Sequence, residues 1–441
     1  MLLAFSAKAE ELEVLLLSVT FGNVDVRSCL RNIVTMFQKI EQERKWRKDN
    51  GRPEGFEALM ARKPIVAVGA EEPLAEQMMV ADFFHGIDGL GGIHTTHPHL
   101  SPQESWQSLF LPQPPNLGAA EASSLRETQD AHSLFTPSVK PAHEEILRIL
   151  REEEEGTVTI VAVGPLTNLA VAAARDPETF LRVKEVVVMG GAVGVPGNVS
   201  LTITFLFILS LFSSLFFLVI FMTPGAEFNT YADSIASARV YALTSPNPQT
   251  TMPPFIPGGK GQLGPYPASL SKRLQVKLFP LEKDITNLHT LPHPLYTTHT
   301  APFLTRGSPL AEWTSLFLTS TFTKIASLEP PSDAPTALQL HDPLTIWYAL
   351  SSSDPKWQFS PETDVRVETA GQWTRGTCIV DRRGREIREG TKDIGAEVVG
   401  DAGGWSDLRK GNRVRWCVGS PGTEEFAGVL LGRVFGGVVA V

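Results

Sequence analysis

Apolar, strand-like runs alternate with helix-like segments along most of this chain, and no other feature constrains its fold as strongly. The predicted strands cover residues 12–19, 64–68, 157–163 and 183–191, which are rich in Leu, Val and Ile. The predicted helices cover residues 26–40, 143–155, 165–175, 232–243, 311–328 and 341–350. Near-continuous apolar strands separated by helices are typical of a parallel sheet that is covered on both faces. We therefore predict an α/β fold with a central, mostly parallel sheet flanked by helices.

Residues 244–310 interrupt this alternation. The stretch is rich in Pro, Gly and Thr, and only residues 274–281 have the apolar character of a strand. We expect long loops through the rest of it.

The charge and composition of the chain exclude several classes of function. Hydrophobic residues make up 42% and charged residues 20% of the 441 residues, as in a soluble globular protein. The net charge of −9 argues against a nucleic-acid partner, which would require a basic face. The three cysteines, Cys29, Cys378 and Cys417, lie far apart and form no metal-binding motif. We therefore expect a reducing compartment and a cytoplasmic location, with a membrane location as the alternative.

An apolar run at residues 201–222 does not fit the rest of the chain. No charged residue occurs between Glu185 and Glu227, and the run is long enough to cross a membrane. It lacks basic flanks, Trp and Tyr, however, and it separates two short polar pieces that suit one site. We favour an insertion such as a retained intron. A transmembrane or interfacial segment and a buried core helix remain as alternatives.

Polar groups on both sides of this run suggest a sugar site. Asn198 precedes it, and Glu227 and Asn229 follow it. Amides and carboxylates together can donate hydrogen bonds to vicinal hydroxyls and accept them, as a sugar ligand requires. The alternative is a polar loop that caps a strand.

Two further motifs are candidates for chemistry. His341 and Asp342 precede a proline at the predicted start of a helix, where a carboxylate can bind a cation and a histidine can act as an acid. The alternative is a helix cap with an incidental histidine. Residues 85–92, which begin with His85, are rich in glycine and suit either an active-site lid or a turn.

Together these pieces resemble the inosine-uridine-preferring nucleoside hydrolases, in sequence and in order. The matching segments are VTFGNVDV (19–26), HGIDGLGG (85–92), VGPLTNLA (163–170), VVVMGGAVGVPGN (186–198), PGAEFNTYAD (224–233) and HDPL (341–344). The resemblance covers nearly the whole chain apart from residues 201–222 and some long loops. The sequence GGIHTTHPH and the Pro-rich insertions resemble the fungal branch of the family.

The resemblance implies one α/β domain that hydrolyses the N-glycosidic bond of purine or pyrimidine ribonucleosides to ribose and free base. It implies a bound Ca²⁺ that holds a water molecule and the ribose diol. His341 would be the acid near the departing base, and Asp342 and the carbonyl group of Val163 would be calcium ligands. The implied substrate-binding residues are Asn23, His85, Met189, Asn198, Glu227 and Asn229. The family also suggests a homo-oligomer.

The sequence departs from the family at its main metal site. The resemblance implies an Asp-x-Asp-x-Gly-x-Asp-Asp cluster on a first strand, which would lie just before residues 2–7 and is not present in the chain. Asp342 and one carbonyl group are too few for Ca²⁺, which takes six to eight oxygen ligands. We therefore expect an N-terminally truncated domain that binds calcium poorly and has impaired activity. The alternative is a ribose-binding pseudoenzyme, which would be anchored to a membrane if residues 201–222 form a membrane segment.

Overall fold

The computed structural model describes residues 1–112, 118–130, 132–197, 225–254, 263–282, 285–329, 333–384 and 399–437. Among these residues the main strands form two sheets. One sheet has the order β1-β2-β3, and the other has the order β4-β5-β6-β12-β9. All pairs are parallel except β12 and β9. The α/β fold with a mostly parallel sheet is therefore confirmed.

The strands of these two sheets are short. They are β1 (Leu16–Val19), β2 (Ile65–Val68), β3 (Thr136–Ser138), β4 (Thr159–Ala162), β5 (Glu185–Met189), β6 (Val276–Phe279), β9 (Gln358–Phe359) and β12 (Arg415–Gly419). Two antiparallel pairs stand apart from the sheets: β7 (Thr290–Pro292) with β8 (Ala337–Gln339), and β10 (Arg366–Val367) with β11 (Cys378–Ile379).

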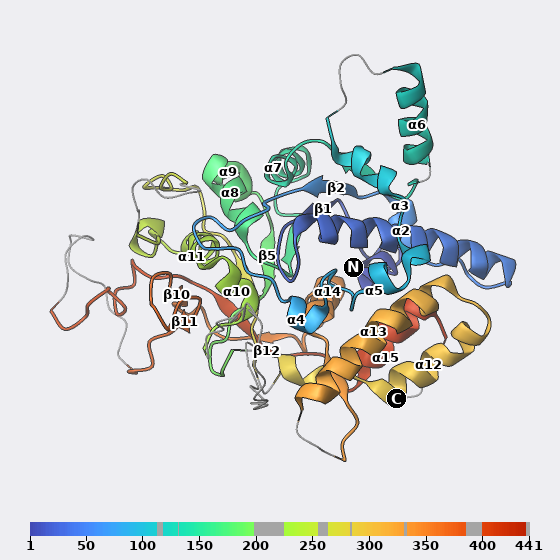
Figure 1. Cartoon of the computed structure of the whole chain (residues 1–441). Helices are drawn as coiled ribbons and strands as arrows, with labels where there is room; N and C mark the ends of the chain where they lie inside the picture. The colour runs from blue at the N-terminus through green and yellow to red at the C-terminus, as the bar shows by residue number, and fades with distance from the viewer. Residues whose placement is uncertain are drawn as a thin grey trace, which may run out of the picture.

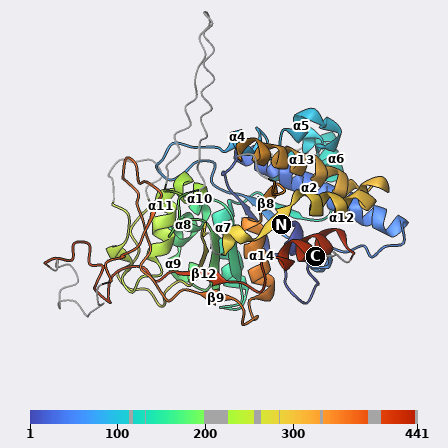
Figure 2. The same cartoon turned by 90° about the horizontal axis from the view of Figure 1, so that it is seen from below.

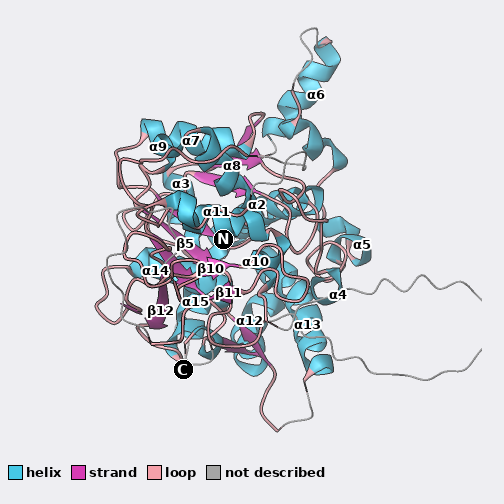
Figure 3. Cartoon of the chain, turned by 90° about the vertical axis from the view of Figure 1, so that its left-hand side faces the viewer, coloured by secondary structure: helices cyan, strands magenta, loops and turns pink. Residues whose placement is uncertain are grey.

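Helices surround the strands (Figure 3). The longer ones are α2 (Val26–Asp49), α6 (Ala119–Asp130), α7 (Ala142–Glu152), α8 (Thr167–Arg175), α11 (Ser234–Ala242), α12 (His293–Thr305), α13 (Pro309–Leu328), α14 (His341–Ser351) and α15 (Glu425–Phe435). The shorter ones are α1 (Leu2–Phe5), α3 (Glu57–Ala61), α4 (Asp82–His85), α5 (Ile93–Thr96), α9 (Pro177–Phe180) and α10 (Phe228–Ala232). Single 3₁₀ turns occur at Pro98–Leu100, Pro248–Thr250 and Thr286–Leu288, and a longer 3₁₀ segment at Glu104–Phe110.

The expectation of long loops through residues 244–310 is wrong at its end. Helix α12 spans His293–Thr305, although Pro302 lies inside the helix and Pro294 lies in its first turn. Proline is tolerated in a first turn but disfavoured in a helix interior. Tertiary packing outweighs that preference here: Tyr296 and Phe303 are buried, and α12 packs against α13 and α15, beside α2 (Figures 1 and 2).

The core explains which strands lie at the centre. All five residues of β5 are buried, whereas β4 and most of β1 are only half-buried. Strands β1 and β4 belong to different sheets and do not pair with each other. The segments that follow β1 and β4 meet instead: a Cβ on Gly22 would lie 3.4 Å from Cδ of Pro165. The ends of β1 and β4 therefore lie close together, which is where ligands bind in open parallel sheets.

None of the helices in the described part of the chain is long and apolar enough to cross a membrane. Residues 201–222, the candidate membrane segment in the sequence, lie outside the described residues.

Candidate active site

Glu227 is the most constrained of the predicted site residues. It caps the N-terminus of α10, and its Oε1 accepts a hydrogen bond from the backbone N–H of Asn229 at 2.7 Å. Its Oε2 accepts from the backbone N–H groups of Gly191 at 2.8 Å and Thr230 at 3.0 Å, and from the Thr230 hydroxyl at 3.1 Å. Burial raises the pKa of Glu227, and these hydrogen bonds oppose the shift. The carboxyl group is therefore fixed in position, with one backbone donor on Oε1 and three donors on Oε2.

Asn229 is held against the end of β5. Its Nδ2 lies 3.1 Å from the carbonyl oxygen and 3.4 Å from the sulfur of Met189, the last residue of that strand. These contacts fix the amide of a half-buried side chain next to Glu227. The structure thus brings together Met189, Glu227 and Asn229.

Helix α14 places His341 and Asp342 at the same end of the sheet. The Tyr348 hydroxyl lies 3.2 Å from both carboxylate oxygens of Glu185, the first residue of β5. Because α14 also packs against β4 and β5, it runs opposite to β5, and its first turn points towards the strand end at Met189.

The ring of His341 has a partner that the sequence did not indicate. Its Nε2 lies 2.8 Å from Oδ1 of Asn287. Burial lowers the pKa of His341 to about 4, and His289 contributes to the shift. His341 is therefore neutral at pH 7.

Asp342 has an altered proton affinity. Part of its side chain reaches solvent, but the surrounding protein displaces water and raises its pKa to about 6. The α-amino group of Met1 lowers this pKa, and the nearby carboxylate of Glu227 raises it. Asp342 and Glu227 therefore influence each other, although they lie on different helices.

Asn23 and His85 form a second group. Among the described residues, no hydrogen bond or ion pair joins this group to Glu227. Asn23 is exposed after β1, and its carbonyl oxygen accepts a 2.8 Å hydrogen bond from the backbone N–H of Ala81, next to α4. His85 ends α4, and burial lowers its pKa to about 4.

The glycine-rich stretch that follows His85 forms an ordered turn. The carboxylate of Asp88 accepts backbone hydrogen bonds from Leu90, Gly92 and His94 at 2.8–2.9 Å. Gly91 has a φ of 71°, which favours glycine, and its N–H bonds to the carbonyl oxygen of His85 at 2.8 Å. The structure therefore shows a hydrogen-bonded turn at these residues.

The described residues do not fit a calcium ion. Val163 follows β4 and is 42% exposed, so its carbonyl group can face the strand ends. No group of three or more His, Cys, Asp or Glu side chains that could hold a metal occurs within the described ranges. Asp342 and one carbonyl group provide too few oxygen atoms. Asn198 lies outside the described residues.

The sequence did not single out three residues that shape the site. These are Asn287 beside His341, Gly191 beneath Glu227, and Asn168 in α8. Nδ2 of Asn168 donates to the carbonyl oxygen of Val19 at 3.0 Å, and its Oδ1 accepts from the backbone N–H of Ala70 at 2.8 Å. Asn168 thus ties the ends of β1 and β2 to the helix after β4. An asparagine in the apolar helix LTNLAVAA was the available signal.

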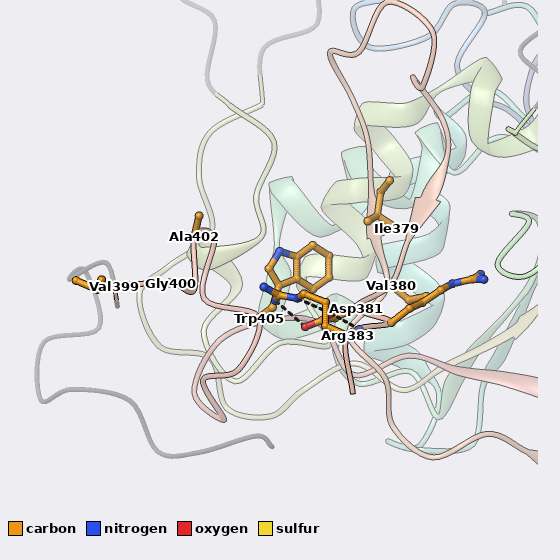
Figure 4. A pocket seen from close by; sticks show the side chains of 9 residues that line it. Ile379, Val380, Asp381, Arg383, Val399, Gly400, Ala402 and Trp405 are labelled. Atoms are coloured by element: carbon orange, nitrogen blue, oxygen red, sulfur yellow. Dashed lines mark hydrogen bonds and ion pairs between the residues drawn. The ribbon is translucent and has the colours of Figure 1, made fainter. Parts of the chain in front are cut away.

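A cavity of about 780 Å³ lies elsewhere, beside β11 (Figure 4). None of the predicted site residues lines it. Arg383 pairs there with Asp381 at 2.7 Å, and the Arg366 guanidinium lies 3.9 Å from the ring centroid of Trp405. Arg382, which also lines the cavity, donates to the carbonyl oxygen of Val193.

Comparisons with known proteins agree with the motifs of the site. The model of a family described as "Inosine-uridine preferring nucleoside hydrolase" matches residues 1–402. The chain is 26% identical over 382 residues to the pyrimidine-specific ribonucleoside hydrolase RihA of Klebsiella pneumoniae, which covers 86% of this chain and 83% of that protein.

Solved structures share the fold. A purine-preferring ribonucleoside hydrolase from Gardnerella vaginalis superposes with a TM-score of 0.58 at 16% identity, covering 98% of this chain and 92% of the other. The plant nucleoside hydrolase PpNRh1 gives 0.56 at 19% identity, with coverage of 98% and 93%. At these identities the likeness supports the fold alone.

Proposed function

The chain belongs to the inosine-uridine preferring nucleoside hydrolase family, an N-glycosyl hydrolase family, and we propose that its ribose site lies where β5, α10 and α14 meet. The observation that carries the proposal is the arrangement of Glu227 and Asn229 at the end of β5. Asp342 is close enough for its charge to interact with that of Glu227. The substrate would be a purine or pyrimidine ribonucleoside.

Ribose recognition would depend on Glu227 and Asn229. Oε1 of Glu227 has one backbone donor and can accept a further hydrogen bond from a ribose hydroxyl. The fixed amide of Asn229 can bind the neighbouring hydroxyl. Asn198 and Met189 would complete this side of the sugar, and Asn23 and His85 would lie towards the base.

In the proposed reaction the C1′–N bond breaks and its electron pair leaves with the base. The oxygen of a water molecule bonds to C1′ and leaves a hydroxyl group there, and the second proton of that water passes to the surrounding solvent. The carboxylates of Glu227 and Asp342 would stabilise the positive charge that develops on the sugar. His341 would donate a proton to the leaving base from Nδ1, while Asn287 accepts from Nε2–H. Because the pKa of His341 is about 4, its acidic form is scarce at pH 7.

We further propose that this chain binds calcium weakly and turns over slowly. The support is the small set of described oxygen ligands, Asp342 and the Val163 carbonyl group. The same observation favours the second candidate, a ribose-binding pseudoenzyme. In that case the contacts of Glu227 and Asn229 would serve binding alone.

We also propose that residues 201–222 are an insertion within one domain. Gly191 on one side contacts Glu227 on the other, at 2.8 Å. A Cβ on Gly197 would collide with the carbonyl oxygen of Ala226, so the two ends of the intervening segment meet. The family match spans the segment as well. Retention of the protein in carbonate-washed membranes would instead support the membrane alternative.

The decisive experiment measures ribose binding and turnover in the same preparation. Purified protein would be titrated with ribose by calorimetry and then assayed for ribose release from inosine and uridine, with added Ca²⁺ or with a chelator. Slow turnover that a chelator abolishes supports the hydrolase, and binding without turnover supports the pseudoenzyme. Absence of both would contradict the proposed site.

A further inference from the structure

Arg375 joins three segments that are far apart in the sequence. It lies in the turn between β10 and β11, and its guanidinium carbon is 3.8 Å from the ring centroid of Tyr231 in α10. Its Nη1 donates to the Tyr231 carbonyl oxygen at 3.0 Å and lies 3.4 Å from Oε1 of Glu76. One side chain thus contacts the ring and the backbone of the same tyrosine and a carboxylate from a third segment.

Glu76 extends this contact to the next helix. Its Oε1 accepts from the backbone N–H of Ser234 at 3.2 Å and from the Ser234 hydroxyl at 2.5 Å, at the start of α11. Its other oxygen, Oε2, is buried and has no hydrogen-bond partner within the part of the chain that the structure describes. Arg375 and Glu76 therefore hold the junction where α10 ends and α11 begins.

The turn that carries Arg375 is rigid and lies directly on α10. Gly376 has a φ of 80°, and its N–H bonds to the Glu368 carbonyl oxygen at 2.7 Å. A Cβ at this glycine would be 2.8 Å from Cα of Tyr231, so only glycine allows this approach. The Arg375 N–H bonds to the Gly371 carbonyl oxygen at 3.1 Å. The guanidinium group is therefore presented by a fixed backbone.

Helix α10 transmits this restraint to the proposed sugar site. The Tyr231 N–H donates to the carbonyl oxygen of Glu227 at 2.9 Å, so both ends of this short helix are tied together. Asn229 lies between them. A shift of Tyr231 would move Asn229 relative to Met189, because a helix of five residues has little freedom to absorb the change.

Charge supplies a second reason for an arginine here. Asp233 is fully buried next to Ser234, and the carboxylate of Glu76 is close enough to influence it. Two buried carboxyl groups repel when both are ionised. The guanidinium group of Arg375 offsets this repulsion, and its planar shape allows it to stack and to donate at the same time.

We propose that Arg375 is a positioning residue that holds α10, and with it Glu227 and Asn229, in the geometry that binds ribose. This inference rests on the proposed function, since it takes α10 as the helix that binds the sugar. Its first part, the fixing of α10, does not depend on any ligand.

The test compares three variants of the full chain. Arg375→Met keeps the length of the side chain without its charge, and Arg375→Lys keeps the charge without the planar fork. Arg383→Met is the matched control, because Arg383 also pairs with a carboxylate, Asp381, but lies in the cavity beside β11. Hydrogen exchange of peptides spanning residues 225–234 reports on α10, and calorimetric titration with ribose reports on the site.

We expect Arg375→Met to exchange the amide hydrogens of Asn229 and Thr230 about tenfold faster and to weaken ribose binding about tenfold, the loss typical of a charged hydrogen bond. Arg375→Lys should lie between this variant and the wild type. Arg383→Met should match the wild type. Added methylguanidinium, but not methylammonium, should restore ribose binding to Arg375→Met, which would not occur if the substitution merely weakened the fold.

Wild-type exchange in Arg375→Met would overturn the inference. So would faster exchange with unchanged ribose affinity, because α10 would then be held without consequence for the sugar. If the wild-type protein binds no ribose, the proposed function fails, and the exchange measurement still decides whether Arg375 fixes α10.

Discussion

The backbone N–H of Gly191 donates to Oε2 of Glu227 at 2.8 Å, across a sequence separation of 36 residues. The apolar run at residues 201–222 lies between these two positions in the sequence. Both sides of the run nevertheless form one hydrogen-bonded unit, with Asn229 anchored to Met189. The folding of the proposed sugar site therefore depends on closing this loop.

Removing the apolar run should leave the fold intact. Because Gly197 and Ala226 are in contact, a variant without residues 201–222 can connect the two sides with a short loop. We expect cooperative thermal unfolding at the same or a higher temperature, and a higher yield of soluble protein. Circular dichroism during heating measures the unfolding temperature and the cooperativity of unfolding. Loss of the cooperative transition would show that the run is part of the core.

Replacing Glu227 by Gln should weaken ribose binding. In the wild type the two carboxylate oxygens accept hydrogen bonds from three backbone N–H groups. A glutamine has only one side-chain oxygen, so its NH₂ group would face at least one of these donors. A buried donor without a partner costs about 1–3 kcal/mol. We expect at least a tenfold loss of affinity by calorimetry and a lower melting temperature. Glu282→Gln is the matched control, because this carboxylate accepts one backbone N–H, from Gly194 at 3.0 Å. Equal effects of both substitutions would remove the special role of Glu227.

Changing Asn287 should tune the acidity of His341. The Asn287→Asp variant places a carboxylate 2.8 Å from the ring and should raise the pKa of His341 from about 4 towards neutrality. Asn287→Leu removes the acceptor and should not raise the pKa. NMR titration of the His341 ring measures this directly, without any need for turnover. An unchanged pKa in Asn287→Asp would mean that Asn287 does not govern this histidine.

Stability should depend on pH through His94. Burial lowers the pKa of His94 to about 4, so between about pH 6.5 and 4 the unfolded chain binds a proton that the folded chain does not. The free energy of unfolding should therefore fall as the pH falls through this window, by up to about 3 kcal/mol for this one group. Asp233, with a pKa raised to about 7, acts in the opposite sense, since its contribution is lost as the pH rises towards 7.

Urea denaturation at several pH values checks this dependence. The His94→Gln variant can keep hydrogen bonds to Asn32 and Ser101 but does not titrate, so its stability should change less between pH 6.5 and 4. A variant with the same pH dependence as the wild type would show that His94 is not responsible.

Calcium should have little effect on this chain. Millimolar Ca²⁺ stabilises a protein that binds it tightly, by several kcal/mol when the ion is at a thousand times its dissociation constant. Because the described residues supply few oxygen ligands, we expect the melting temperature to be the same with Ca²⁺ and with a chelator. A clear rise with Ca²⁺, and not with Mg²⁺, would contradict this prediction.

The sequence determined the class of fold and led to the polar groups proposed for the site. Apolar strand runs and helical spacing are local properties of the chain, so the α/β sheet was predictable. Glu227, Asn229 and Met189 could be proposed as site residues because they lie in short motifs. Helix α12 was missed because its prolines argue locally against a helix, and only packing by Tyr296 and Phe303 outweighs them.

The tertiary structure alone decided which residues support these groups. Asn287, Asn168 and Arg375 act through partners that are 54, 149 and 144 residues away in the sequence. No periodicity or spacing encodes such contacts, because they arise only when the packed elements bring distant side chains within hydrogen-bonding distance. The same physical reason explains the proton affinities of His341 and Asp342, which depend on burial and on neighbouring charges that the sequence does not display.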